Sequence, residues 1–196
     1  MDIHYEQHFY KVEFLKNNFL RNLCSGQHVL EVGCFEGEIT KHIVECSPKS
    51  LCLLEASSGC INRLQEKFPQ ARVIHGDMHD DFDHVGSVEV AILLGVIYHT
   101  HAPLFVLEQL VNCCSPKHIV LDNMSQSLGW HIEIPNQPGM RYVLGDKKCC
   151  NIVINIGDEI IASALDNLGY QLITHAQYPE QTRSPGMPVF HFEKRV

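Results

Sequence analysis

Apolar runs of strand length alternate with amphipathic stretches of helical period along the first two thirds of the chain. The apolar runs occupy residues 28–32, 51–55, 71–75, 88–94 and 118–122. The helical stretches between them cover residues 38–46, 58–68 and 102–114. Gly, Pro, Asn and Asp mark the joins. Because alternating strands and helices build a parallel sheet with helices on both faces, the pattern predicts an α/β fold.

Segments at both ends of the chain extend this pattern. Residues 4–23 carry apolar side chains at the spacing of an amphipathic helix that packs on the main body. Residues 158–168 predict another helix, which Gly169 ends. Residues 171–175 and 188–192 predict two closing strands with hairpin geometry.

Residues 124–151 break the alternation, because they are rich in Gly and Pro and show little periodicity. A loop of this length in a compact domain is typical of a lid or a binding segment. Within it, Trp130 and Arg141 offer apolar surface and a hydrogen-bond donor for a substrate. A solvated surface loop is the alternative. Residues 1–196 are otherwise expected to form one domain, with an N-terminal helix in residues 1–24.

Composition narrows the classes of partner. The net charge of −8 disfavours nonspecific binding to nucleic acid or anionic membranes, although a local basic patch remains compatible with it. No stretch approaches the length of a membrane span. The nine cysteines form no Cys-x-x-Cys pair, and the chain opens without a signal peptide. We therefore expect reduced thiols in a cytoplasmic protein.

The first strand runs into a glycine turn and then a helix, the arrangement that forms the floor of nucleotide-type sites. Gly33 and Gly37 have the spacing G-x-x-x-G, whereas the dinucleotide fingerprint is G-x-G-x-x-G. Phe35 stands where a second glycine would admit a pyrophosphate. Glu36 and Glu38 place carboxylates at the helix N-terminus, where they complement the helix dipole. The turn therefore favours a ligand that is uncharged or cationic at its centre.

This turn also carries a family resemblance. The string Glu31-x-Gly33-x-x-x-Gly37, followed by Thr40, resembles motif I of class I methyltransferases that use S-adenosylmethionine (SAM). The resemblance covers residues 25–122 by motif and the whole chain by strand order. It implies a doubly wound, Rossmann-like, seven-stranded and mostly parallel sheet with an antiparallel last strand. It also implies SAM as the cofactor and S-adenosylhomocysteine as the product, with Glu31 holding the ammonium group. A generic strand-turn-helix is the alternative.

The second strand also ends in an acid, Glu55, which is followed by Ala56. A carboxylate at this place can accept two hydrogen bonds from a ribose diol. The resemblance assigns Glu55 to the ribose and Ala56 to the same cofactor site. A helix-capping region, with Ser57 or Ser58 as the cap, is compatible with this role.

The third strand ends in Asp77 and Met78. In the resembled family, the acid at this place accepts a hydrogen bond from the adenine amino group, and the next residue packs on the adenine face. A thioether against a flat ring is physically reasonable. Core filling is the alternative role of Met78.

The fourth strand leads into a loop where chemistry is expected. In the resembled family this loop lies beside the sulfonium and the acceptor, so the resemblance implies that Gly95 lies beside the cofactor. Tyr98 is expected to orient the acceptor, and His99 is a candidate general base. Alternatively, Tyr98 only packs and His99 only binds the loop backbone. His99 and His101 also suggest a metal, but the adjacent cysteine pairs have poor spacing for ligands, so no metal is expected.

Residues 95–103 carry a second, local likeness. The string Gly-Val-x-Tyr-His-x-x-x-Pro resembles that of the enzymes that modify wobble uridine in transfer RNA with carboxy-SAM. Three functions follow from these observations. The first is methyl transfer from SAM to an oxygen or nitrogen of a small-molecule acceptor by a monomer or homodimer. The second is a carboxy-SAM enzyme acting on transfer RNA, and the third is a SAM-binding module without turnover.

Overall fold

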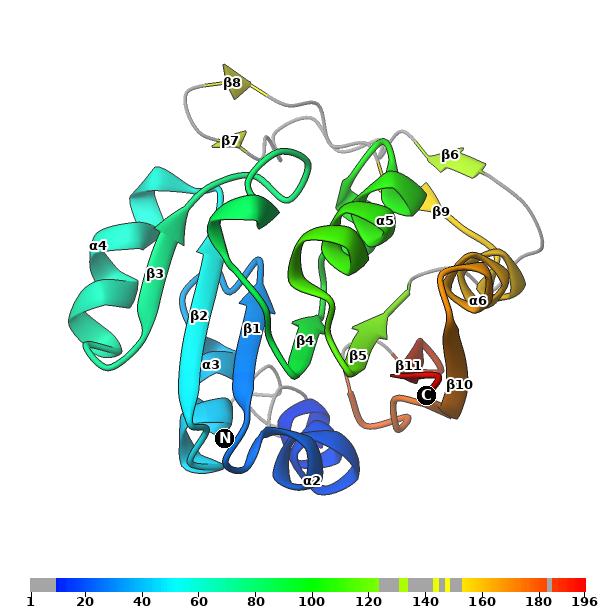
Figure 1. Cartoon of the computed structure of the whole chain (residues 1–196), viewed down its shortest axis with the longest axis horizontal. Coiled ribbons are helices and arrows are strands. Elements are labelled where there is room, and N and C mark those ends of the chain that lie inside the picture. The colour runs from blue at the N-terminus through cyan, green and yellow to red at the C-terminus, as the bar shows by residue number, and fades with distance from the viewer. Residues whose placement is uncertain (1–9, 124–130, 134–142, 145–146, 149–152, 183–184) are drawn as a thin grey trace.

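A seven-stranded sheet forms the centre of the molecule (Figure 1). The computed structural model describes residues 10–123, 131–133, 143–144, 147–148, 153–182 and 185–196. The strand order is β10-β11-β5-β4-β1-β2-β3. The parallel strands are β1 (His28–Val32), β2 (Ser50–Glu55), β3 (Arg72–His75), β4 (Val90–Leu93) and β5 (His118–Asp122). The closing hairpin consists of β10 (Tyr170–Gln177) and β11 (Pro188–Lys194), and β11 pairs antiparallel with β5. The predicted fold class is confirmed.

Helices cover the sheet on both faces, with α3 behind it and α5 in front in Figure 1. The helices are α3 (Glu38–Glu45), α4 (Ser58–Lys67), α5 (Pro103–Cys114) and α6 (Asp158–Asn167). Two short 3₁₀ segments, η2 (Phe82–His84) and η3 (Ile97–His99), follow β3 and β4. Pro103 stands at the first turn of α5, where its missing N–H is not needed. Gly169 has φ +89° and follows Leu168, the C-cap residue of α6, as its predicted helix-ending role requires.

The N-terminal helix is described from residue 10 onward. It continues through a π-helical stretch, η1 (Lys16–Leu20), into α2 (Arg21–Cys24). Its apolar stripe includes the buried Phe19 and Leu20, while the Phe14 ring meets the Tyr178 ring edge-on at 5.5 Å. The predicted amphipathic helix is confirmed for this part, and residues 4–9 lie outside the described residues.

The core lies along the central strands. Leu30, Ile92 and Val120 have no solvent exposure. They are register partners or next neighbours on β1, β4 and β5, and helices cover these strands on both sides. Strands that are buried on both faces require an unbroken apolar run, which explains why the sequence showed runs here instead of alternation.

Short strands occur inside the segment that was expected to be irregular. These are β6 (His131–Glu133), β7 (Val143–Leu144) and β8 (Lys147–Lys148), and β9 (Val153–Asn155) follows. β6 pairs with β9 and β7 pairs with β8. The expectation of a wholly irregular segment was therefore wrong, because strands of two or three residues are too short to show a period. Trp130 and Arg141 lie outside the described residues, and the lid remains a prediction.

The seven cysteines that the structure describes are free thiols, and most of them are buried. In the described part of the chain, no helix is both long enough and apolar enough to cross a membrane.

Candidate functional site

The candidate residues come together because the strands that carry them are neighbours. The order β4-β1-β2-β3 places four carboxyl ends side by side at one edge of the sheet. Glu31 is the register partner of both Leu53 on β2 and Ile92 on β4. Glu55 pairs with His75 at the end of β3. In open α/β sheets, ligands bind in the crevice outside these ends.

The glycine turn is fixed by close packing. Gly33 has φ +68°, and its N–H donates to the Leu54 carbonyl at 2.8 Å. A Cβ at this residue would lie 2.5 Å from Val96 Cγ2. Gly37 has φ +84° and caps α3, where a Cβ would overlap the Phe68 ring. Both positions therefore require glycine for their backbone conformation and for the space they leave.

Two acids of the turn lie at the N-terminus of α3. Glu36 lies before α3, where its carboxylate pairs with the Arg63 guanidinium and its carbonyl accepts Lys67 Nζ at 3.0 Å. Glu36 therefore lies at the N-terminus of α3, as expected, directly before the N-cap residue Gly37, and its carboxylate pairs with Arg63 of α4. Glu38 remains as the acid in the first turn of α3. Phe35 has φ +48° and is 61% exposed, so its side chain faces solvent at the mouth of the turn.

Glu31 lies beneath the turn and is almost fully buried. Its Oε2 accepts the Thr40 hydroxyl at 2.6 Å. Burial raises the pKa of Glu31 to about 7, because the charged form loses its hydration; the Thr40 hydrogen bond opposes the rise and the charge on Glu55 adds to it. A nearby cation would stabilise the charged form of this carboxyl, which is compatible with the predicted contact to an ammonium group.

Glu55 joins two backbone segments. Its Oε2 accepts the Phe35 N–H and its Oε1 accepts the Ser57 N–H, each at 2.7 Å. Each carboxylate oxygen has a second lone pair that can accept from a ribose hydroxyl. Ser57 stands at the N-cap of α4, one of the two cap positions expected, but its side chain makes no capping hydrogen bond, and its own N–H donates to Glu55. The Ala56 carbonyl lies 3.3 Å from His75 Nε2.

Asp77 begins the loop after β3. Its N–H donates to Asp81 Oδ2 at 2.6 Å, and its own Oδ1 accepts the His79 N–H at 2.9 Å. His79 Nδ1 lies 2.5 Å from the same Oδ1. Met78 is half-buried and packs against the core, so its side chain takes part in core filling as the alternative expected.

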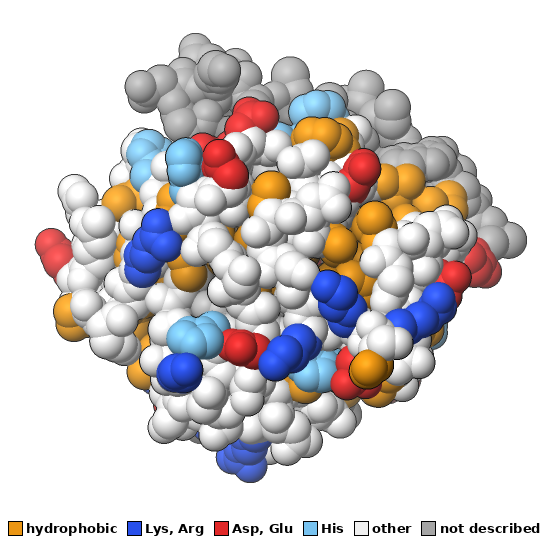
Figure 2. All heavy atoms as spheres, in the orientation of Figure 1, with side chains coloured by type: hydrophobic (Ala, Val, Ile, Leu, Met, Phe, Trp, Pro, Cys, Tyr) orange, Lys and Arg blue, Asp and Glu red, His pale blue; other side chains and the backbone are white. Residues whose placement is uncertain are grey.

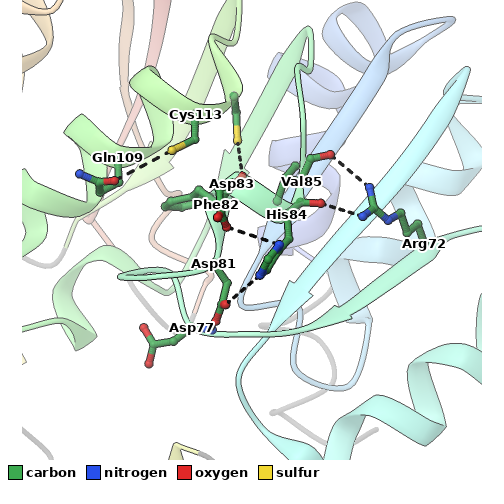
Figure 3. A network of polar contacts seen from close by, with 10 residues as sticks. Arg72, Asp77, Asp81, Phe82, Asp83, His84, Val85, Gln109 and Cys113 are labelled. Carbon is green, nitrogen blue, oxygen red and sulfur yellow. Dashed lines mark hydrogen bonds and ion pairs between the residues drawn. The ribbon is translucent and has the colours of Figure 1, made fainter.

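A separate network holds the rest of this loop (Figure 3). The Arg72 guanidinium donates to the His84 carbonyl at 2.7 Å and the Val85 carbonyl at 3.3 Å. The His84 ring pairs with Asp81 and Asp83 at 3.7 and 3.6 Å. In Figure 3 the Asp77 carboxylate points away from Asp81 and His84. Arg72 therefore holds the loop backbone at His84 and Val85, and the Asp77 carboxylate points away from this network (Figure 3).

The loop after β4 carries the candidate catalytic groups. Gly95 has φ +75°, and a Cβ there would lie 3.6 Å from the Tyr98 hydroxyl, so this hydroxyl reaches back over the glycine. Tyr98 is 9% exposed, and its ring centroid lies 4.6 Å from that of His99. Burial lowers the pKa of His99, and the charge on Asp122 opposes this. His99 is therefore a neutral imidazole at neutral pH, the form that can accept a proton.

Asp122 is a residue that the sequence reasoning missed. It ends β5 with no solvent exposure, and its Oδ1 accepts the Gly95 N–H at 2.6 Å. Its Oδ2 accepts the Tyr178 hydroxyl at 2.9 Å and lies 3.4 Å from Lys11 Nζ. A buried carboxylate needs such partners. The sequence signal that could have identified Asp122 is its place as an acid at the end of the apolar run 118–122.

An apolar groove lies away from these strand ends. It is an open depression of about 330 Å³ between α5 and α6, and Leu104, Ile160 and Ala164 give it an apolar lining. Figure 2 shows hydrophobic side chains gathered there. It contains none of the predicted site residues. No group of three or more His, Cys, Asp or Glu in the described ranges is placed to hold a metal.

A family comparison identifies the class of enzyme to which the chain belongs. The model of a methyltransferase domain family matches residues 4–175. The chain belongs to this methyltransferase family. The predicted resemblance to class I SAM-dependent methyltransferases is thereby confirmed, and with it the enzyme class.

Solved structures share the methyltransferase fold at low identity. The magnesium protoporphyrin IX methyltransferase of Synechocystis PCC 6803, with bound S-adenosylhomocysteine, has a TM-score of 0.68 and 14% identity over 98% of this chain and 84% of its own. The N-methyltransferase NodS of Bradyrhizobium japonicum WM9, in complex with S-adenosylhomocysteine, has a TM-score of 0.68 and 15% identity over 99% of this chain and 88% of its own. The 1,6-didemethyltoxoflavin-N1-methyltransferase of Burkholderia thailandensis has a TM-score of 0.68 and 10% identity over 98% of this chain and 85% of its own. Such likeness shows the shared fold.

Proposed function

We propose that this methyltransferase moves the methyl group of SAM to an oxygen or nitrogen atom of a small-molecule acceptor. The observation that carries the proposal is the gathering of Glu31, Glu55 and Asp77 at three adjacent strand ends, beside a turn that excludes side chains at Gly33. A carboxyl with a pKa near 7, a second carboxylate and a third acid suit the ammonium, ribose and adenine groups of one cofactor.

The reaction needs little covalent help from the protein. A lone pair of the acceptor attacks the methyl carbon in line with the carbon–sulfur bond, and the electron pair of that bond stays on sulfur. The cofactor then leaves as neutral S-adenosylhomocysteine. The protein contributes by placing the two reactants in contact and by excluding water. Where the acceptor is a hydroxyl or a protonated amine, His99 takes its proton, and the lowered pKa of His99 keeps it ready to do so.

The small-molecule acceptor has two lines of support. The net charge of −8 disfavours a polyanionic substrate. In addition, two of the structural relatives are named for a porphyrin and a toxoflavin precursor as substrates. The wobble-uridine likeness of residues 95–103 stays a prediction.

Calorimetry of the intact protein with SAM and with S-adenosylhomocysteine tests the cofactor site. We expect both to bind, and Glu55→Gln to weaken both. Glu45→Gln is the matched control, because Glu45 is a surface acid that pairs with Lys16, away from the strand ends. Absence of binding by a normally folded protein would overturn the proposal.

Methyl transfer is tested with methyl-labelled SAM and a panel of phenols, amines, carboxylic acids and transfer RNA. Label in a small molecule supports the proposal. Label in transfer RNA alone, or tighter binding of carboxy-SAM than SAM, contradicts it in favour of the transfer RNA enzyme. Tight SAM binding without label in any acceptor contradicts it in favour of a binding module.

A further inference from the structure

Three polar side chains connect the loop after β3 to the loop after β4. His79 Nδ1 lies 2.5 Å from Asp77 Oδ1, and His79 Nε2 is within hydrogen-bond distance of Thr100 Oγ1. The His79 ring is also stacked on the His101 ring, with centroids 4.8 Å apart and planes 19° apart. The ring is thus held at both nitrogens and on one face, which leaves it a single orientation.

The donors and acceptors that surround the His79 ring are consistent with one tautomer of that ring. Asp77 Oδ1 is an acceptor, so the proton of a neutral His79 ring belongs on Nδ1. Nε2 then accepts the Thr100 hydroxyl, and Thr100 Oγ1 accepts the Ala102 N–H at 3.0 Å. Every donor meets an acceptor in this arrangement. A network satisfied in this way is rigid, and it ties the start of α5 to the end of β3.

The order acid, imidazole and hydroxyl is also that of hydrolytic triads, but the surroundings exclude this use. Thr100 is 1% exposed, and its oxygen already accepts the Ala102 N–H. A nucleophile must reach its substrate, and this hydroxyl is closed in. The chain of contacts therefore serves to position groups.

We propose that His79 is a positioning residue that aims Asp77 at the cofactor; this rests on the proposed function. The Asp77 backbone N–H is held by Asp81, and both His79 donors bind Oδ1. Among the described residues, no partner is present for Asp77 Oδ2, and 35% of the side chain is exposed. His79 thus keeps Oδ2 turned outward to accept the adenine amino group. Through Thr100 it couples this contact to the loop of Tyr98 and His99.

Two ligands that differ at the adenine amino group test the proposal. S-adenosylhomocysteine carries this amino donor, whereas S-inosylhomocysteine has an oxygen in its place. A hydrogen bond to a charged acceptor leads us to expect the wild-type protein to prefer the first by about tenfold or more. His79→Ala frees Asp77 and should remove most of this preference. A change of preference between two ligands of the same shape does not follow from a general loss of stability.

Two further variants complete the test. His79→Asn places an amide N–H near the position of Nδ1, so it should keep the preference. His84→Ala removes another histidine of the same loop, which pairs with Asp81 and Asp83 and not with Asp77. This variant should also keep the preference for S-adenosylhomocysteine. An unchanged preference in His79→Ala, or none in the wild type, would overturn the role of His79 while leaving the proposed function intact. Failure of the wild type to bind either ligand would instead overturn the proposed function.

Discussion

Glu55 Oε2 accepts the Phe35 N–H at 2.7 Å, so the acid that ends β2 holds the glycine turn that follows β1. The same carboxylate binds the Ser57 N–H through its other oxygen. The predicted ribose acid is therefore also a structural brace of the cofactor turn. The proposed contact to the cofactor and the stability of the turn therefore rest on the same side chain.

Glu55→Ala should lower both cofactor affinity and stability. Two backbone N–H groups lose a charged acceptor, at a cost of about 2 kcal/mol or more in the free energy of unfolding. Glu55→Gln retains an acceptor oxygen and should cost less. Urea unfolding with and without S-adenosylhomocysteine separates the two effects. An equal loss in Glu45→Ala, whose side chain lies at the surface, would contradict this account.

Gly33→Ala should destabilise the protein through both backbone strain and a clash with Val96. The positive φ alone costs roughly 1–2 kcal/mol for an L-residue, and the clash adds about 1–3 kcal/mol. Gly86→Ala is the matched control, since Gly86 has φ +83° and nothing near its Cβ position. A double-mutant cycle with Val96→Ala measures the clash by itself. A Gly33→Ala cost equal to that of Gly86→Ala, with no coupling to Val96, would contradict the close approach.

Stability should fall as the pH rises through the titration of Glu31. The pKa of Glu31 is raised from 4.5 to about 7, so between these values the folded protein binds more protons than the unfolded chain. Its contribution is therefore full below pH 4.5 and lost above about 7, and it amounts to roughly 3 kcal/mol at about 1.4 kcal/mol per pH unit. Urea midpoints of wild type and Glu31→Gln across this range isolate the effect. If the urea midpoints of the two proteins changed with pH in parallel, the titration of Glu31 would not be the cause.

SAM binding near pH 6.5 should release a proton if Glu31 meets the ammonium group. A cation beside the carboxyl favours its charged form and lowers its pKa from about 7. Calorimetry in two buffers of different ionisation enthalpy counts the released protons. Glu31→Gln should release none. The same proton count in the variant and the wild type would show that another group titrates.

Methyl transfer to a hydroxyl acceptor should not change with pH near neutrality, and it should fall only in more acidic solution than the ordinary pKa of histidine would give. Burial lowers the pKa of His99 from 6.5, so the base form is already dominant at neutral pH. His99→Gln should lower kcat by about 100-fold or more, the usual contribution of a general base, and remove the acidic limb. Release of S-adenosylhomocysteine measures the rate. His84→Gln serves as the control, and an acidic limb that persists in His99→Gln would reject His99 as the base.

The elements that the sequence predicted best are those with a strong local signal. β1 was placed at its observed bounds, because a short run with Val29, Leu30 and Val32 ends at a glycine turn. α5 begins at Pro103, within a residue of the expected start. β6, β7 and β8 were missed, since strands this short are defined by their pairing partner and not by their own period.

The candidate site residues could be selected one by one from the sequence, but their contacts could not. Glu31, Glu55 and Asp77 could be selected because each acid follows an apolar run. Asp122 has the same signal, yet its role depends on Gly95 and Tyr178, which are far from it in sequence. The pairing of Glu36 with Arg63 was likewise invisible.

The order of strands and helices, the glycines of the turn and the acids at the strand ends follow from the sequence alone, because periodicity and turn chemistry act over a few residues. Which of these acids brace the fold and which face a ligand was decided by the tertiary structure. The pairing of β1 with β2 brings Glu55 to Phe35, and the packing of the loop after β3 on the loop after β4 brings His79 to Thr100. Hydrogen bonds between distant segments depend on this packing, and no local pattern encodes them.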